Sequence, residues 1–277
     1  MFLRLRCVFI RAGMPHVRVG EVELYYELVD CTEPWHSGPP PIVLLHGLGT
    51  DRRIWLYQVP ELCGRVPTIL VDLRGHGRSS APDGEWSVAD MAHDVVRLLR
   101  HLGAERVHLL GLSMGGMVAQ QFALDYPYAT ASLLLASTVS GIPADAQDAK
   151  KESLQFIANH SMAEVAQARI TAAFSDAVDP VMRLHLIESV ALNRKPAYEQ
   201  AARAVFDFSI TQRLDEISVP TLVIAGAAER TFPLAWVESL AQRIRGARLV
   251  TIPGAAHLCN MERPREFNRA VLEFLGV

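Results

Sequence analysis

Short apolar runs alternate along the chain with longer segments in which apolar residues recur every three or four positions. The short runs are typical of buried strands and the longer segments of amphipathic helices. Their regular alternation predicts strand and helix units on a mostly parallel sheet flanked by helices, which is an α/β architecture. The segment from Val22 to Val29 alternates apolar and polar residues and is expected to be an early strand. Buried strands are predicted at 42–46, 68–72, 107–111, 132–136, 221–225 and 248–252.

The segment from Ser87 to Gly103 illustrates the predicted helices. Serine is a favoured residue at the start of a helix, and glycine often follows its last turn. Apolar residues recur at helical spacing between these two positions. The segment 263–275 shows the same periodicity and is predicted to be a terminal amphipathic helix.

One region contains helical patterning without a strand-like run. It covers residues 139–213, is rich in alanine and carries scattered large apolar residues. We interpret it as a helical cap inserted into a core formed by 14–138 and 214–277. Residues 1–13 are interpreted as an N-terminal extension, because a better-formed segment opens at Met14.

Composition and charge narrow the function classes. The chain has 277 residues, half of them hydrophobic, and a net charge of -3 with acids and bases interspersed, so no basic footprint for nucleic acid is expected. The apolar start is interrupted by arginines and is too charged for a signal peptide or membrane span. Scattered cysteines indicate neither a metal site nor a disulfide framework and suit a cytoplasmic location. These cysteines are Cys7, Cys31, Cys63 and Cys259. We expect the protein to be a monomer or a homodimer and to need no cofactor.

A single serine stands among glycines where an apolar run meets a helical segment. Gly111, Ser113 and Gly115 form the pattern Gly-x-Ser-x-Gly. This pattern is typical of a nucleophile elbow, a turn so tight that the two glycine positions cannot carry side chains. The turn presents the hydroxyl at a helix N-terminus, where exposed amides and the helix dipole favour an anion. Ser113 is therefore the predicted nucleophile, and a turn serine without chemistry is the alternative.

A second glycine-containing bend follows the strand predicted at 42–46. Its sequence His46-Gly47-Leu48-Gly49 allows the backbone amide of Leu48 to turn toward Ser113. Together with the amide of Met114 it would form a two-donor oxyanion hole. His46 is interpreted as a hydrogen-bonded scaffold residue.

The predicted general base is His257, which lies in the loop between the last strand and the last helix. Its imidazole is suited to accept the serine proton near neutral pH. A carboxylate should orient the imidazole, and Glu229 is the only acid in the loop after the strand at 221–225. A solvated histidine and a surface glutamate are the competing interpretations. The alternative acids on other loops are Asp145, Asp148 and Asp215.

Two further features are interpreted as structural. Asp72 and His76 lie in the segment "DLRGHGRSS", whose glycines and Asp-Arg pair fit a rigid turn beside the elbow. Cys259 follows His257 by two residues, and no neighbouring cation favours its thiolate. It is expected to be a small packed residue.

These motifs together resemble the α/β-hydrolase superfamily from about Val17 onward. The stretches "HGLGTDRRIW", "DLRGHGRSS", "GLSMGG" and "PGAAHLCNMERP" carry the resemblance, and "LGTDRRIW" with "LGLSMGGMVAQ" is most similar to 3-oxoadipate enol-lactonases and related esterases and lactonases. The resemblance implies Ser113 as nucleophile, His257 as base and amide donors at Leu48 and Met114. The family usually has aspartate in a Gly-x-x-Asp pattern where this chain has Glu229.

The predicted activity is cofactor-free hydrolysis of a carboxylic ester or lactone by a serine hydrolase, through an acyl-enzyme. A carbon-carbon bond hydrolase or cofactor-free lyase on the same scaffold, and a ligand-binding receptor with vestigial hydrolysis, are the alternatives. Basic residues of the insertion are candidates for a substrate carboxylate, although interspersed acids equally suit solvated helix faces. Among these basic residues are Arg169, Arg183, Arg194 and Arg203.

Overall fold

A computed structural model describes residues 15–32 and 39–277, so the proposed extension at 1–13 lies outside the described residues. Within these described residues, eight strands form one sheet in the order β1-β2-β4-β3-β5-β6-β7-β8. β1 and β2 pair antiparallel, as do β2 and β4, and the other neighbours are parallel. The predicted mostly parallel sheet is therefore confirmed. The strands are β1 His16–Val19, β2 Val22–Val29, β3 Ile42–Leu45, β4 Thr68–Asp72, β5 Val107–Leu112, β6 Thr130–Ala136, β7 Thr221–Gly226 and β8 Arg248–Ile252.

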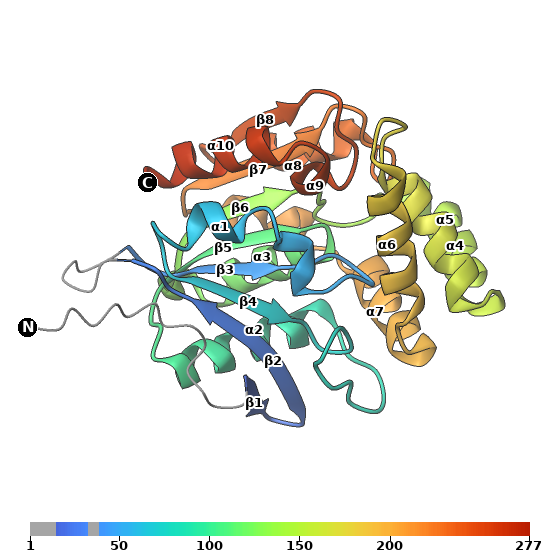
Figure 1. The fold of residues 1–277 in the computed structure, drawn as a ribbon, viewed down its shortest axis with the longest axis horizontal. Coiled ribbons are helices and arrows are strands. Elements are labelled where there is room, and N and C mark those ends of the chain that lie inside the picture. The colour runs from blue at the N-terminus through green and yellow to red at the C-terminus, as the bar shows by residue number, and fades with distance from the viewer. Residues whose placement is uncertain (1–14, 33–38) are drawn as a thin grey trace, which may run out of the picture.

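Helices cover both faces of this sheet (Figure 1). Alternate strand residues supply the two cores: Val43 belongs to the core that also contains residues of α2, α3 and α8, whereas Leu44 belongs to the core that contains residues of α9 and α10. The helices are α1 Val59–Leu62, α2 Val88–Leu102, α3 Met114–Asp125, α4 Gln147–Asn159, α5 Met162–Ala173, α6 Pro180–Ala191, α7 Lys195–Asp207, α8 Leu234–Arg243, α9 Cys259–Glu262 and α10 Pro264–Leu275.

The predicted boundaries of α2 are confirmed by its caps. The side chain of Ser87 accepts a hydrogen bond from the Asp90 amide, and the Asp90 carboxylate accepts one from the Ser87 amide. Gly103 ends the helix in a left-handed conformation with φ 69°. Both ends therefore satisfy backbone groups that the helix itself leaves unpaired.

One strand differs from its predicted environment. β8 has the predicted residues 248–252, but its pattern is not that of a buried strand, because Arg248, Leu249 and Thr251 are exposed. Among the described residues, the strand lies at the edge of the sheet and pairs with β7 alone. An apolar run alone does not distinguish an edge strand from a central one.

The four helices α4 to α7 fall within the predicted insertion and lie beyond the carboxyl ends of the parallel strands (Figure 1). We call these helices with their connections the cap. An isolated antiparallel bridge between Gly141 and Ser209 joins the two ends of the insertion. The cap thus faces the carboxyl ends of the parallel strands, where the loops after β3, β5, β7 and β8 emerge.

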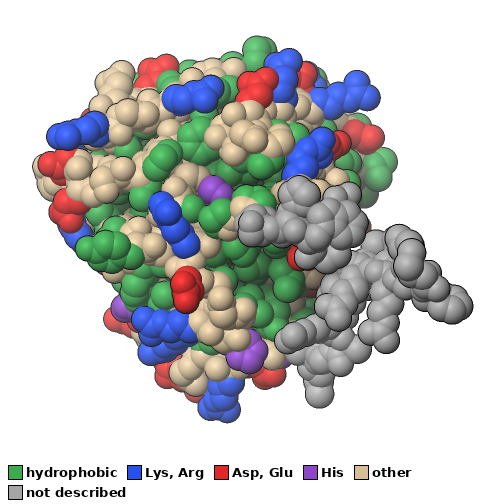
Figure 2. Space-filling model, turned by 90° about the vertical axis from the view of Figure 1, so that its left-hand side faces the viewer, with side chains coloured by type: hydrophobic (Ala, Val, Ile, Leu, Met, Phe, Trp, Pro, Cys, Tyr) green, Lys and Arg blue, Asp and Glu red, His purple; other side chains and the backbone are tan. Residues whose placement is uncertain are grey.

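The face opposite the cap carries Lys and Arg side chains interspersed with Asp and Glu (Figure 2). Within the described ranges, none of the helices combines the length and apolar character needed to cross a membrane. The same residues contain no group of three or more His, Cys, Asp or Glu side chains that could hold a metal ion.

Candidate active site

Ser113 occupies a strained turn between β5 and α3. Its backbone has φ 52° and ψ -115°, a conformation that side-chain-bearing residues rarely adopt. A Cβ atom at Gly111 would overlap the carbonyl of Gly115, and one at Gly115 would overlap the carbonyl of Leu45. The two glycines therefore allow the helix to begin directly against the sheet, as the motif predicts.

Hydrogen bonds hold this turn in place. The Ser113 amide donates to the carbonyl of Ala136 on β6 at 2.9 Å. The Ser113 carbonyl accepts from the hydroxyl of Thr138 at 2.7 Å and from the amide of Gly116 at 2.9 Å. The half-buried Ser113 side chain makes no capping bond to α3, so its hydroxyl is left at the positive end of the helix.

The loop after β3 lies beside this serine. A Cβ atom at Gly47 would stand 3.5 Å from the Cβ of Ser113. Neither the Leu48 amide nor the Met114 amide donates a hydrogen bond to any described residue. The two backbone donors predicted for the oxyanion hole are thus both uncommitted.

His46 fixes the base of this loop. The Leu73 amide donates to His46 Nε2 at 2.9 Å, so the ring proton lies on Nδ1, which is 2.8 Å from the Gly47 carbonyl. Complete burial lowers the pKa of His46 to about 4, so both hydrogen bonds belong to the neutral ring. The interpretation of His46 as a scaffold residue is confirmed.

His76 packs against His46 with ring centroids 5.1 Å apart. Burial, followed by the neighbouring His46, lowers the pKa of His76 to about 3. The carboxylate of Asp72 accepts from the backbone amides of Arg52 and Arg78, each at 2.9 Å. Asp72 and His76 therefore form the rigid turn that the sequence predicts.

Acidification is expected to destabilise the folded protein between about pH 6.5 and pH 4. In the unfolded chain His46 and His76 take up a proton near pH 6.5, whereas burial lowers both pKa values in the folded state. The unfolded state then binds more protons, and the free energy of unfolding falls by about 1.4 kcal/mol per pH unit for each histidine. Urea unfolding at several pH values measures this slope. His76→Gln should flatten it while the exposed His101→Gln should not; parallel slopes in all three proteins would contradict the assignment.

His257 and Glu229 form a buried pair at the carboxyl ends of β8 and β7. His257 Nδ1 lies 2.8 Å from Glu229 Oε2, and the Glu229 side chain has no exposed surface. Glu229 Oε1 also accepts from the amides of Thr231 at 2.7 Å and Phe232 at 3.4 Å. Burial alone would raise the pKa of Glu229, but the His257 charge and these hydrogen bonds outweigh it and lower the pKa. The carboxylate thus remains ionised beside the imidazole.

Ser113 follows β5, whereas Glu229 and His257 follow β7 and β8, and these parallel strands all end on the same side of the sheet. β6 lies between β5 and β7 (Figure 1). No hydrogen bond joins Ser113 to His257 in the described part of the chain, although catalytic hydrogen bonds are often long before substrate binds. His257 Nδ1 is engaged by Glu229, which leaves Nε2 for proton exchange. The alternative acids Asp145, Asp148 and Asp215 are all exposed, and none contacts His257.

Glu262 supports the His257 loop in a way that the sequence did not indicate. Its carboxylate accepts from the Ala256 amide at 2.6 Å and from the Ser175 amide in the cap at 2.5 Å. It therefore ties the loop that carries His257 to the α5–α6 connection. An acidic residue in this segment was visible, but its backbone partners are brought to it only by the fold.

Cys259 is packed, as predicted. It is fully buried, its sulfur lies 3.7 Å from the hydroxyl of Ser137, and burial raises the pKa of the thiol to about 12. A thiol with this pKa is protonated at neutral pH and is a poor nucleophile.

The four candidate arginines of the cap have different environments. Arg169 donates to the hydroxyl of Ser153, and Arg183 donates to the carbonyl of Ser175 at 2.9 Å. Arg203 is exposed on α7, whereas Arg194 lines a cavity between the cap and the core. The cap therefore does not direct its arginines to one common point.

Comparison with known proteins gives one family and several relatives. The model of the alpha/beta hydrolase family matches residues 42–270. The 3-oxoadipate enol-lactonase 1 of Acinetobacter baylyi is 31% identical over 238 residues, covering 83% of this chain and 88% of that protein. The pimeloyl-(acyl-carrier protein) methyl ester esterase of Aeromonas hydrophila is 28% identical over 257 residues, covering 86% and 96%. The solved structure of the enol-lactonase from Burkholderia xenovorans LB400 has a TM-score of 0.88 and 29% identity, covering 95% of this chain and 100% of that one.

Proposed function

Because the chain belongs to the alpha/beta hydrolase family, we propose that it is a serine hydrolase that cleaves carboxylic esters or lactones. The observation that supports this most directly is the strained Ser113 at the N-terminus of α3, beside the uncommitted amides of Leu48 and Met114. His257, which is hydrogen-bonded to the buried carboxylate of Glu229, also lies at the carboxyl ends of the parallel strands. A nucleophile, a base and an oxyanion site are the parts that acyl transfer requires.

The proposed reaction proceeds through an acyl-enzyme. Ser113 Oγ attacks the carbonyl carbon while His257 Nε2 accepts its proton, and the carbonyl oxygen becomes an oxyanion held by the amides of Leu48 and Met114. Glu229 stabilises the imidazolium that forms. His257 then protonates the leaving alkoxide as the carbon-oxygen bond breaks, and afterwards it activates a water that hydrolyses the acyl-enzyme. With a lactone the alkoxide remains tethered, so a single ring-opened product leaves.

The substrate class is proposed from the relatives. Enol-lactonases and a methyl ester esterase are similar to this chain over most of its length. We propose a small lactone or ester that carries a carboxylate as the preferred substrate. Hydrolysis of this substrate in the cytoplasm would suit the free cysteines Cys63 and Cys259.

Covalent labelling combined with a substrate screen tests this proposal. A fluorophosphonate is expected to add once to the wild-type protein, and peptide mass spectrometry should locate the adduct on Ser113. The screen compares short and long esters, simple lactones and a carboxylated enol-lactone. Faster cleavage of neutral long-chain esters would contradict the carboxylate preference. Labelling without hydrolysis of any ester or lactone would favour carbon-carbon bond cleavage, and neither labelling nor hydrolysis would favour a receptor.

A further inference from the structure

The loop after β3 forms a tight turn over residues 47–50. The backbone amide of Thr50 donates to the carbonyl of Gly47 at 3.2 Å, which closes the turn. The turn stands beside the proposed reacting centre, because a Cβ atom at Gly47 would lie 3.5 Å from that of Ser113. Its second residue is Leu48, whose amide donates to no described residue. The direction of the Leu48 N–H therefore depends on how this turn is held.

Three donors converge on the carbonyl of Gly47. Besides the Thr50 amide, the Thr50 hydroxyl donates to this carbonyl at 2.9 Å, and the neutral ring of His46 donates from Nδ1 at 2.8 Å. Both side chains are buried, so their bonds to the carbonyl are shielded from competing water. The Gly47 carbonyl is therefore fixed in direction.

The Gly47 carbonyl and the Leu48 N–H belong to the same peptide group. None of the peptide bonds in the described ranges is cis, and a planar trans group directs its C=O and its N–H to opposite sides. The donors that fix the carbonyl thus also fix the N–H, which points away from His46 and Thr50. Hydrogen bonds accepted by the carbonyl further polarise the peptide group, so its N–H becomes a stronger donor.

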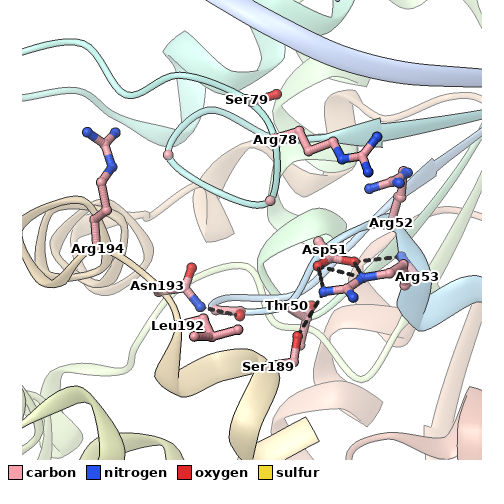
Figure 3. Close-up of a pocket in the computed structure, with 13 residues that line it drawn as sticks. Thr50, Asp51, Arg52, Arg53, Arg78, Ser79, Ser189, Leu192, Asn193 and Arg194 are labelled. Carbon is pink, nitrogen blue, oxygen red and sulfur yellow. Dashed lines mark hydrogen bonds and ion pairs between the residues drawn. The ribbon is translucent and has the colours of Figure 1, made fainter. Parts of the chain in front are cut away.

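The cap supports the same turn from the other end. Asn193 Nδ2 donates to the carbonyl of Gly49 at 2.7 Å (Figure 3) and to that of Val190 at 2.9 Å. Since both partners are carbonyls, the amide nitrogen of Asn193 must be the atom that faces the turn. The Gly49 carbonyl shares a peptide group with the Thr50 N–H. A chain of hydrogen bonds therefore runs from the cap through two peptide groups to the Leu48 amide.

We propose that Thr50 is a positioning residue for the oxyanion site. Its hydroxyl, which holds the Gly47 carbonyl, aims the Leu48 N–H at the oxyanion and strengthens it as a donor. The role of Thr50 rests on the proposed serine hydrolase function, because the oxyanion forms only when Ser113 attacks a carbonyl. An oxyanion accepts a hydrogen bond more strongly than the neutral carbonyl of a bound ester does. The effect of Thr50 therefore falls mainly on the transition state.

Hydrolysis of p-nitrophenyl acetate by wild type and Thr50→Val tests this role. Valine removes the hydroxyl and keeps the shape of the side chain. We expect kcat to fall about tenfold, which is less than the roughly 10²-fold to 10³-fold cost of losing a whole oxyanion donor, because the Thr50 amide and His46 still hold the carbonyl. KM should stay within about twofold of wild type. Thr50→Ser, which keeps a hydroxyl, should retain kcat within about threefold.

A trifluoromethyl ketone inhibitor reports on the oxyanion directly. Ser113 Oγ bonds to its carbonyl carbon, the serine proton passes to His257, and the carbonyl oxygen becomes an oxyanion that resembles the transition state. The inhibition constant should rise about tenfold in Thr50→Val, in parallel with the fall in kcat.

The matched control is Thr68→Val. Thr68 is buried at the start of β4, at the end of the strand opposite the candidate site, and its hydroxyl donates to the carbonyl of Val66 at 3.0 Å. Both valine variants lose one buried hydrogen bond from a hydroxyl to a carbonyl, so their melting temperatures should fall by similar amounts. Only Thr50→Val should lose kcat. If Thr50→Val does not fold, Thr50→Ala replaces it, because alanine also removes the hydroxyl.

The outcomes separate the role of Thr50 from the proposed function. If wild type hydrolyses the ester and Thr50→Val keeps kcat within about twofold of it, or loses only in KM, the role of Thr50 alone is overturned. Equal losses of kcat in Thr50→Val and Thr68→Val also overturn it, since they would reflect stability. If wild type hydrolyses no ester or lactone, the proposed function fails and the role of Thr50 fails with it.

Discussion

Ser113→Ala is expected to reduce kcat/KM for an ester or lactone substrate by about 10⁴-fold to 10⁶-fold and to abolish fluorophosphonate labelling. Alanine has no oxygen with which to attack the carbonyl carbon, so the covalent route is lost. The amides of Leu48 and Met114 would still polarise a bound carbonyl, which accounts for any residual hydrolysis. Initial rates and intact-mass spectrometry measure the two effects.

The matched control is Ser239→Ala, which removes an exposed hydroxyl from α8. This variant should keep wild-type rates and the single adduct. Label on Ser113→Ala, or turnover within tenfold of wild type, would show that another residue is the nucleophile. Circular dichroism of Ser113→Ala should match wild type, because the backbone bonds of the turn do not use the side chain.

Much of the architecture could be predicted from the sequence because strands and helices leave separate periodic signals. The runs at 68–72 and 248–252 coincide with β4 and β8, and the caps of α2 were visible as Ser87 and Gly103. The family resemblance is confirmed by the match over 42–270. The exposure of β8 could not be predicted, because the order of strands depends on how the chain crosses over between them.

Some residues of the candidate site could also be predicted from the sequence, whereas others could not. Ser113 was predictable because a tight turn restricts its neighbours to glycine, and His257 because it lies on a loop after the last strand. Glu262 was not predictable, because its partners are backbone amides, which every residue except proline carries. The cavity at the α6–α7 connection was also missed, since its walls come together only where the cap folds over the core.

Glu229→Gln is expected to lower kcat by about 10²-fold to 10⁴-fold while the protein remains folded. Glutamine can still accept from the amides of Thr231 and Phe232, so the loop should keep its hydrogen bonds. Its amide nitrogen, however, would donate to His257 Nδ1 and place the ring proton on Nε2, where it prevents acceptance of the serine proton. The imidazolium also loses its stabilising charge. Steady-state rates across pH measure the effect.

Comparison of acids at other positions decides whether Glu229 orients His257. Glu238→Gln, a change on the neighbouring helix α8, should leave the rate unchanged. Glu229→Asp keeps a negative charge, but its side chain is one methylene shorter, so the carboxylate lies farther from His257. Its activity should therefore exceed that of Glu229→Gln if the loop adjusts. Should Glu229→Gln retain activity within a few-fold of wild type while one of the other acid changes abolishes it, the orienting carboxylate lies on another loop. The other acids for this comparison are Asp145, Asp148 and Asp215, each changed to asparagine.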